Sequence, residues 1–220
     1  MSRSARPLSL YWELAVTIGA SNHDAMSGEG FMDGANPAAS DGDEIEMNAD
    51  SSESTPRRLP GHTDSCFGCG SENTSGLHLQ AWRIGDEIYA DVAFDERHIG
   101  GPGLAHGGAI AAACDELLGF TLWLVGAPAV TRALTIDYLA PVPLHETHRV
   151  TAKVDKEKGR AIHVSLVGTS ASGKVAFTAN GVYVRVPFEH FNDFGTMPTP
   201  VNELQEKLAR ESGRDRRHRQ

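Results

Sequence analysis

The chain has few cysteines and few aromatic residues. Only three of its 220 residues are cysteine, and 7% are aromatic. Small secreted domains that rely on disulfides carry many cysteines in even numbers, so Cys66, Cys69 and Cys114 do not form a disulfide framework. We therefore expect a cytoplasmic protein in a reducing environment, with a core built by hydrophobic packing.

Positive charge and long apolar runs are also scarce. The 20 Lys and Arg residues are outnumbered by 29 Asp and Glu residues, which gives a formal net charge of -9. Proteins that bind nucleic acids present a basic face to the phosphates, so we expect no nucleic-acid partner. No uninterrupted apolar run reaches the roughly 18 residues needed to cross a bilayer, so we expect no membrane partner. Residues 1–22 superficially resemble a targeting peptide, but Glu13 interrupts their apolar stretch.

Composition divides the chain into three parts. Residues 1–60 are rich in Gly, Ser, Asn, Asp and Glu, and they are predicted to be a disordered acidic extension because they bury too little apolar surface. Residues 61–190 are predicted to form one domain. Residues 191–220 are predicted to be a tail with a possible short helix over 201–211.

Apolar and polar residues alternate in two groups of predicted strands. The first group is a hairpin around the turn Gly85-Asp86. Residues 107–125 follow, and they are apolar or small on nearly every face, which predicts a helix buried all round. The second group is predicted to be a four-stranded meander over 129–141, 146–157, 160–171 and 174–186. A helix without a polar face must be wrapped by a sheet. The predicted fold is therefore α+β, with a six-stranded antiparallel sheet around one long central helix, which is the hotdog arrangement.

Two features of this helix suggest chemistry. Gly107 and Gly108 stand at its start, where backbone N–H groups lack partners and can polarise a carbonyl. Taken alone, the two glycines are better explained by close packing of the helix. Asp115 lies eight residues later, about 12 Å further along the helix axis, so one carbonyl cannot touch both groups of the same helix. If two helices pack antiparallel in a dimer, Asp115 of one subunit faces Gly107 of its partner. The alternative is a buried Asp bonded to a neighbouring strand.

The motifs together resemble a known family, the hotdog-fold acyl-CoA thioesterases of the 4-hydroxybenzoyl-CoA thioesterase superfamily. The likeness is strongest to its branch of phenylacetate-pathway and mitochondrial acyl-CoA thioesterases. It rests on His106-Gly107-Gly108 with Asp115 nine positions after the histidine, and on Thr131 at the start of the next strand. Further matches are "IDYLAPVP" at 136–143, "KEKGR" at 156–160 and "CFGCGSENTSGLHL" at 66–79. The resemblance covers about residues 66–186. Thr74 stands where the branch often has proline, and residues 1–60 lie outside the family pattern.

The resemblance implies a role for each matching residue. Asp115 would act as general base or nucleophile on an acyl-CoA thioester, and the Gly107 N–H of the partner subunit would polarise the carbonyl. His106 and Gly108 would shape the site, and Thr131 would orient Asp115 or hold the attacking water. Substrate contacts would come from Asp137 and, at the CoA phosphates, from Lys156, Lys158, Gly159 and Arg160. The implied assembly is a homodimer or a dimer of dimers that needs no cofactor and no metal.

Two other functions stay open. A non-catalytic acyl-CoA-binding sensor is disfavoured by the presence of Asp115 and Thr131. An enoyl-CoA hydratase is disfavoured because the helix lacks a closely spaced Asp/His pair.

Cys66 and Cys69 form a Cys-x-x-Cys pair whose purpose is ambiguous. A structural zinc usually needs four ligands. His62 and His78 are candidates for the other two, although their spacing is not a recognised pattern. A redox pair lacks its usual sequence context. Reduced structural thiols are the preferred interpretation, and Cys114 is expected to be a small packing residue of the helix.

Overall fold

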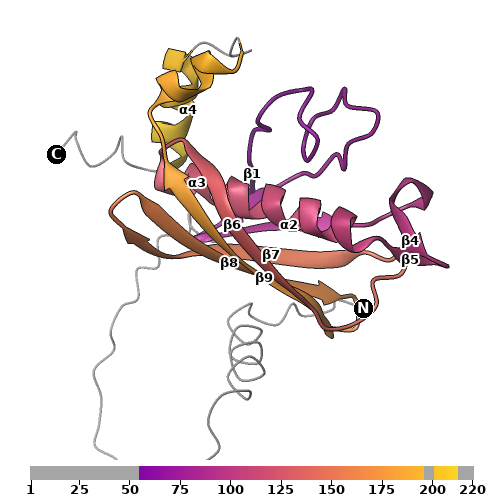
Figure 1. The fold of residues 1–220 in the computed structure, drawn as a ribbon. Helices are drawn as coiled ribbons and strands as arrows, with labels where there is room; N and C mark the ends of the chain where they lie inside the picture. Colours follow the sequence, from indigo (N-terminus) through magenta and orange to yellow (C-terminus); the bar gives the residue numbers. More distant parts are fainter. Residues whose placement is uncertain (1–54, 196–200, 213–220) are drawn as a thin grey trace, which may run out of the picture. The chain divides into compact units, whose positions relative to one another are not determined.

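A long helix packs against one antiparallel sheet (Figure 1). This computed structural model describes residues 55–195 and 201–212, so most of the expected disordered extension lies outside the described residues. The main sheet has seven strands in the order β1-β2-β3-β7-β8-β9-β6. They are β1 (Arg57–Arg58), β2 (Trp82–Ile84), β3 (Glu87–Val92), β6 (Ala129–Tyr138), β7 (His148–Lys158), β8 (Ala161–Ser170) and β9 (Val175–Arg185). The predicted hotdog fold is confirmed, with the short β1 as an added strand.

The remaining elements lie around this sheet. A two-stranded sheet pairs β4 (Ile99–Gly101) with β5 (Leu104–Ala105), just before the long helix. Two 3-10 helices, η1 (Glu96–His98) and η2 (Phe188–Asp193), follow β3 and β9. The predicted hairpin is present as β2 and β3. Gly85 has a φ of 56° in its turn, a conformation that glycine adopts without strain. Its first strand is shorter than predicted, because residues 77–81 lie outside any strand.

The predicted meander is wrong for its first strand. β6 does not pair with β7, and it lies instead at the sheet edge beside β9. The connection over 139–147 explains this result, because it runs along the molecule and does not turn back. It begins at β9, where Leu139 and Ala140 donate to the Ala176 carbonyl, and its His145 donates to the Phe94 carbonyl after β3. β7 therefore pairs with β3, and the two predicted strand groups join into one sheet.

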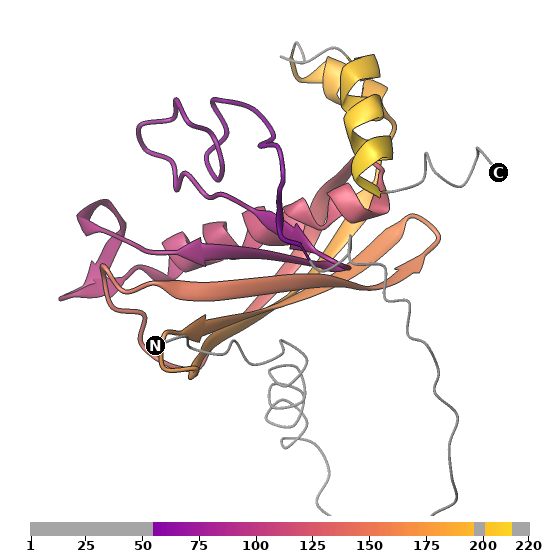
Figure 2. The same cartoon turned by 180° about the vertical axis from the view of Figure 1, so that it is seen from behind.

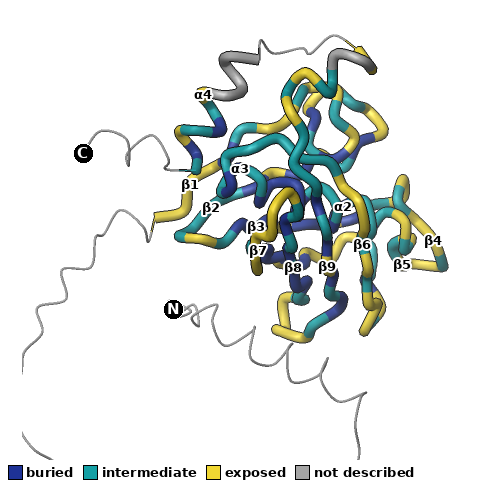
Figure 3. The backbone as a smooth tube through the Cα atoms, turned by 60° about the vertical axis from the view of Figure 1, so that its left-hand side comes forward, coloured by how far each residue is buried: buried dark blue, intermediate teal, exposed yellow. Residues whose placement is uncertain are grey.

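The predicted buried helix is present in two parts, α2 (Gly107–Phe120) and α3 (Leu122–Val125). Leu117, Leu118 and Phe120 are at most 1% exposed in the hydrophobic core, and each such side chain contributes about 1.5–3 kcal/mol of burial free energy. Figure 3 shows buried and intermediate residues along the helix. By length and composition alone, Gly107–Val125 is apolar enough to cross a membrane. However, 56% of its most apolar 18-residue stretch is buried inside the fold.

The described chain extends beyond the predicted domain boundary at residue 61. Arg57–Arg58 form β1, and Leu59 after them is 3% exposed. The predicted C-terminal helix is α4 (Val201–Ser212), which contacts α3. Arg57 pairs with Glu211, and Leu208 is 6% exposed. The two ends of the described chain therefore contact each other, and α4 also contacts α3.

Candidate functional site

The start of α2 is capped by its own histidine. His106 has extended backbone angles, and its Nδ1 accepts the Gly108 N–H at 2.8 Å. The N–H groups of Ala109 and Ile110 both reach the His106 carbonyl. The Gly107 N–H has no acceptor among residues 55–195 and 201–212. One N–H group at the positive end of the helix therefore remains available to a ligand.

The two glycines at the helix start differ in their surroundings. A Cβ atom on Gly108 would lie 2.9 Å from His106 Nδ1, so this glycine allows the cap. A Cβ atom on Gly107 would meet Tyr138 at 3.5 Å, an ordinary contact. The Tyr138 hydroxyl donates to the Gly107 carbonyl at 2.8 Å and thereby ties the helix start to β6.

Asp115, further along α2, is held by two hydroxyl groups of the sheet. Thr131 Oγ1 donates to Asp115 Oδ1 at 2.9 Å, and the Tyr183 hydroxyl donates to the same oxygen at 3.0 Å and to the Asp115 carbonyl at 2.8 Å. Burial raises the pKa of Tyr183, and the neighbouring Asp115 charge raises it further. The Tyr183 hydroxyl therefore stays a donor. Asp115 Oδ2 has no partner within the described ranges. One carboxylate oxygen is thus fixed and the other is available.

The register of β6 on β9 brings these two hydroxyls together. Thr131 lies opposite Tyr183, so both side chains point to the same face of the sheet. A register shift follows directly, between Thr131 and Ala133. Such bulges redirect side chains and are frequent beside active sites.

Within one chain, the predicted catalytic residues form two separate groups. Gly107, Gly108 and His106 stand at the start of α2, near the Tyr138 end of β6. Asp115 and Thr131 stand about 12 Å further along the helix, at the other end of β6. The structure does not bring the Gly107 N–H and the Asp115 carboxylate together in one subunit.

The predicted substrate residues also divide between these groups. Asp137 is exposed next to Tyr138, on the Gly107 side. The turn of Lys156, Lys158, Gly159 and Arg160 joins β7 to β8 and lies near the beginning of β6, on the Asp115 side. Arg160 donates twice to the Arg185 carbonyl, and Gly159 turns the chain with a φ of 58°.

A second cluster of polar groups lies on another side of α2. Figures 1 and 2 both show the loop over 60–76 on the face of α2 that points away from β7–β9. This loop brings His62, Cys66 and Cys69 to Glu116, the neighbour of Asp115, with one ligand-type atom of each within 4.8 Å of the others. His78, the other histidine considered from the sequence, is not in this cluster, because its Nδ1 contacts the Gly70 carbonyl at 2.8 Å.

The groups of this cluster shift one another's protonation. Burial opposes the charge on His62, but its hydrogen bonds to Cys66, Cys69 and Glu116 raise its pKa well above the usual value. Burial also opposes the charge on Glu116, yet contact with His62 holds its pKa below the usual value. The His62 hydrogen bond lowers the pKa of the Cys66 thiol, whereas burial raises that of Cys69. Burial raises the pKa of Cys114 to about 12, as expected for a packing residue.

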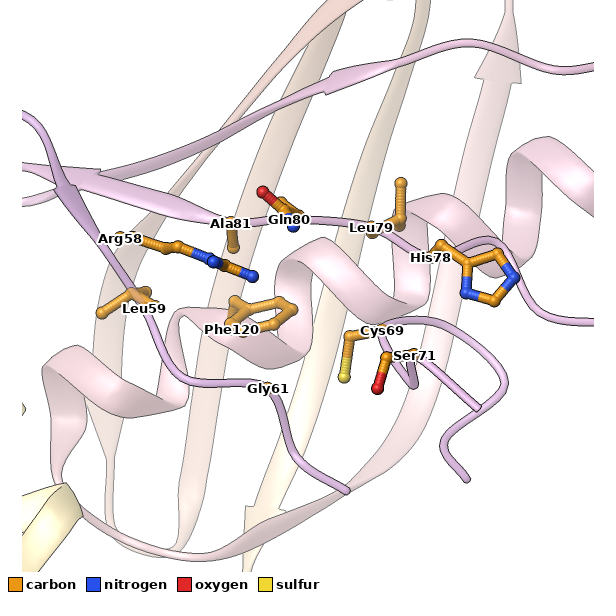
Figure 4. A pocket seen from close by; sticks show the side chains of 10 residues that line it. All are labelled: Arg58, Leu59, Gly61, Cys69, Ser71, His78, Leu79, Gln80, Ala81 and Phe120. Atoms are coloured by element: carbon orange, nitrogen blue, oxygen red, sulfur yellow. The ribbon is translucent and has the colours of Figure 1, made fainter. Parts of the chain in front are cut away.

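A cavity of about 200 Å³ opens beside this cluster (Figure 4). Phe120 of α2 lies in the view between the segment of Leu79–Ala81, which precedes β2, and the segment of Leu59 and Gly61. Cys69 and Ser71 lie beside it. Asp115, Thr131 and Gly107 do not line this cavity. It is therefore separate from the Asp115 group.

Three of these residues were missed from the sequence. Tyr183 and Tyr138 are ordinary aromatic positions of predicted strands, and only the register of the strands brings them to α2. In the sequence, Glu116 is simply the polar residue after Asp115. It joins a cluster only because the 60–76 loop passes beside it.

Comparison with known proteins shows what the central part of this chain is similar to. The sequence profile of the thioesterase superfamily matches residues 102–177, which include Gly107, Asp115 and Thr131. The acyl-coenzyme A thioesterase THEM4 of Bos taurus is 33% identical over 88 residues, which cover 40% of this chain and 36% of that protein. THEM5 of Homo sapiens is 28% identical over 91 residues, covering 41% and 37%. The matches thus span little more than a third of these relatives.

A solved structure supports the fold over a longer range. A crystal structure of a thioesterase superfamily protein superposes with a TM-score of 0.54, at 23% identity, over 84% of this chain and 81% of that chain. Because the two sequences are only 23% identical, this similarity is evidence for a shared fold alone. Residues 102–177 are therefore similar to the thioesterase superfamily, and the central helix inside its antiparallel sheet gives the described domain the hotdog fold.

Proposed function

We propose that this protein hydrolyses an acyl-CoA thioester to the free acid and CoA, in a site that two subunits complete. The observation that carries the proposal is the anchoring of Asp115. Two hydroxyls fix its Oδ1, while Oδ2 remains open to a substrate or a water molecule. The similarity to acyl-coenzyme A thioesterases supports the choice of substrate class.

Asp115 would act in one of two ways. As a general base it takes a proton from water, and the resulting hydroxide attacks the thioester carbonyl. As a nucleophile it attacks the carbonyl itself and forms a mixed anhydride, which water then hydrolyses. In both cases the carbon–sulfur bond breaks, and CoA leaves as a thiolate that takes up a proton.

The developing negative charge on the carbonyl oxygen needs a donor. The Gly107 N–H is suited to this task because it lies at a helix start and has no acceptor within the described ranges. Its position about 12 Å from Asp115 along the helix prevents both groups from serving one carbonyl in one chain. An antiparallel second copy would place its Gly107 beside this Asp115.

Exposure of the relevant surface supports this arrangement. Thr131, Gly108 and Asp137 are all exposed in the single chain, although they flank the proposed reaction centre. A second copy packed on this side of α2 and β6 would enclose them. Lys156, Lys158 and Arg160 would then lie at the rim near Asp115, where they suit the phosphates of CoA.

The proposal is tested with the purified full chain and a panel of acyl-CoA esters of different chain length, including aromatic esters. Released CoA is followed with a thiol reagent. We expect hydrolysis of at least one ester. If CoA esters bind but none is hydrolysed, the non-catalytic sensor is the correct function. If an enoyl-CoA loses its conjugated absorbance without release of CoA, the protein is a hydratase.

A further inference from the structure

We propose that His62, Cys66, Cys69 and Glu116 bind one structural zinc ion. This inference goes beyond the proposed hydrolysis and does not depend on it. The four residues come from two distant parts of the chain, the loop after β1 and the middle of α2.

The distances fit a tetrahedral site. With zinc–sulfur bonds of about 2.3 Å and zinc–nitrogen or zinc–oxygen bonds of about 2.0 Å, neighbouring ligand atoms lie about 3.3–3.8 Å apart. Here Cys69 Sγ lies 3.5 Å from His62 Nδ1, and Cys66 Sγ lies 3.7 and 3.6 Å from the two oxygens of Glu116. His62 Nδ1 and Glu116 Oε1 are 2.9 Å apart. Small side-chain rotations therefore suffice to surround one ion.

The backbone of the loop is shaped around these groups. A Cβ atom on Gly68 would lie 2.3 Å from the Glu116 carboxyl group, so only glycine lets this acid reach the cysteines. A Cβ atom on Gly70 would lie 2.4–2.5 Å from backbone atoms of Asp64 and Cys66. The Gly70 N–H closes the turn on the Cys66 carbonyl at 2.9 Å. Both glycines of "CFGCG" thus serve the geometry of the Cys-x-x-Cys turn.

The imidazole is also held in place. Its ring lies 4.8 Å from that of Phe120 and is stacked on Trp123 at 6.3 Å. The His62 backbone N–H donates to Cys69 Sγ at 3.2 Å, an additional interaction with a coordinating sulfur. A site whose ligands are oriented by neighbouring groups binds metal more tightly.

The set of donor atoms favours zinc over other ions and over a redox role. Two sulfurs, one imidazole nitrogen and one carboxylate oxygen suit a tetrahedral zinc, whereas calcium and magnesium prefer oxygen alone. Four protein ligands close the coordination sphere, as in structural sites. A catalytic disulfide pair does not explain why a half-buried carboxylate and a histidine converge on the same two thiols.

The ion would fasten the 60–76 loop to the catalytic helix. Cys69 lines both the cluster and the cavity of about 200 Å³, which gives the ion a path to its ligands. Because Glu116 follows Asp115 directly, the ion would also stabilise the segment of α2 that presents Asp115. Its removal should lower the thermal stability of the folded protein.

The test uses the full chain expressed without a histidine tag. Elemental analysis should find about one zinc per chain, as a closed four-ligand site requires. After chelation, added Co²⁺ should give the visible absorption of tetrahedral cobalt together with a thiolate charge-transfer band. Iodoacetamide should modify Cys66 and Cys69 only after chelation. Buried Cys114 should stay unmodified in the folded protein in both states.

Variants separate this site from adventitious binding. Cys69→Ser and His62→Ala should lose at least nine-tenths of the bound zinc, and Glu116→Gln should weaken zinc binding at least tenfold. The matched controls Cys114→Ala and His78→Asn should keep it. If the untagged chain carries no zinc and binds neither Zn²⁺ nor Co²⁺ after reduction, the proposal is wrong. A reversible Cys66–Cys69 disulfide in such a metal-free protein would identify a redox pair.

Discussion

Two adjacent carboxylates on α2 have different surroundings. Asp115 faces β6 and β9, where two neutral hydroxyls donate to its Oδ1 and leave Oδ2 without a partner among the described residues. Glu116 points about 100° away around the helix, toward the 60–76 loop. Both of its oxygens are engaged there, by His62 and by Cys66.

The difference is consistent with the two roles proposed for this helix. A carboxylate held by hydroxyls through one oxygen keeps its other oxygen free, which suits a base or a nucleophile. A carboxylate surrounded by an imidazole and two thiols has no free oxygen left, which suits a ligand of a structural ion. The predictions below exploit this contrast.

The largest effect is expected at Asp115. Asp115→Asn removes the base and should lower kcat by about 10²–10⁴-fold. Glu116→Gln, the same chemical change one residue further, should leave kcat within several-fold of the wild type while reducing bound zinc. Steady-state kinetics on one acyl-CoA and elemental analysis of both proteins check this pair. Equal loss of activity in both variants would contradict the division of roles.

The next effect concerns the helix start. Gly107→Pro removes the N–H group and should lower kcat by about 10²–10³-fold. Proline fits the first position of a helix, and His106 has the extended angles (φ -66°, ψ 136°) that a residue before proline requires. Gly107→Ala retains the N–H and should lose far less activity. If the two variants are equally impaired, the loss is steric, and Gly107 is not the oxyanion donor.

A smaller effect is expected from the two hydroxyls. A hydrogen bond to a charged group contributes about 1.5–3 kcal/mol, so Tyr183→Phe and Thr131→Val should each lower kcat by roughly tenfold or more. KM should change little, because both residues position Asp115. A change in KM alone would show that they contact the substrate instead.

The smallest effect is expected at the β7–β8 turn. Lys156→Ala and Lys158→Ala remove exposed charges, and each should raise KM for an acyl-CoA about two- to fivefold, with kcat unchanged. The difference from wild type should shrink as salt is added. Kinetics with a short acyl-pantetheine, which lacks the nucleotide phosphates, provide the control, because this substrate should not distinguish the variants.

The fold was predictable where local patterns determine it. Residues 107–125 have no polar face, so they had to be wrapped by a sheet, and Gly85-Asp86 marked the hairpin. The pairing of β6 with β9 was not predictable, because the path of residues 139–147 depends on contacts with distant backbone groups such as the Phe94 carbonyl.

The candidate sites show the same limit. Asp115 was conspicuous because a lone acid interrupts an apolar helix. Its partner Tyr183 was not, since its role follows from strand register. Cys66, Cys69 and His62 were visible as candidate ligands, but Glu116 joins them only through the folded loop. The sequence alone therefore favoured reduced structural thiols.

Subunit mixing tests the shared catalytic site most directly. Asp115→Asn and Gly107→Pro chains are each inactive alone and are co-refolded in equal amounts. Random pairing makes half of the dimers mixed, and each mixed dimer contains one intact composite site. Activity should therefore recover to about a quarter of the wild-type value per chain. Folded, mixed dimers without recovered activity would contradict a site shared between two subunits.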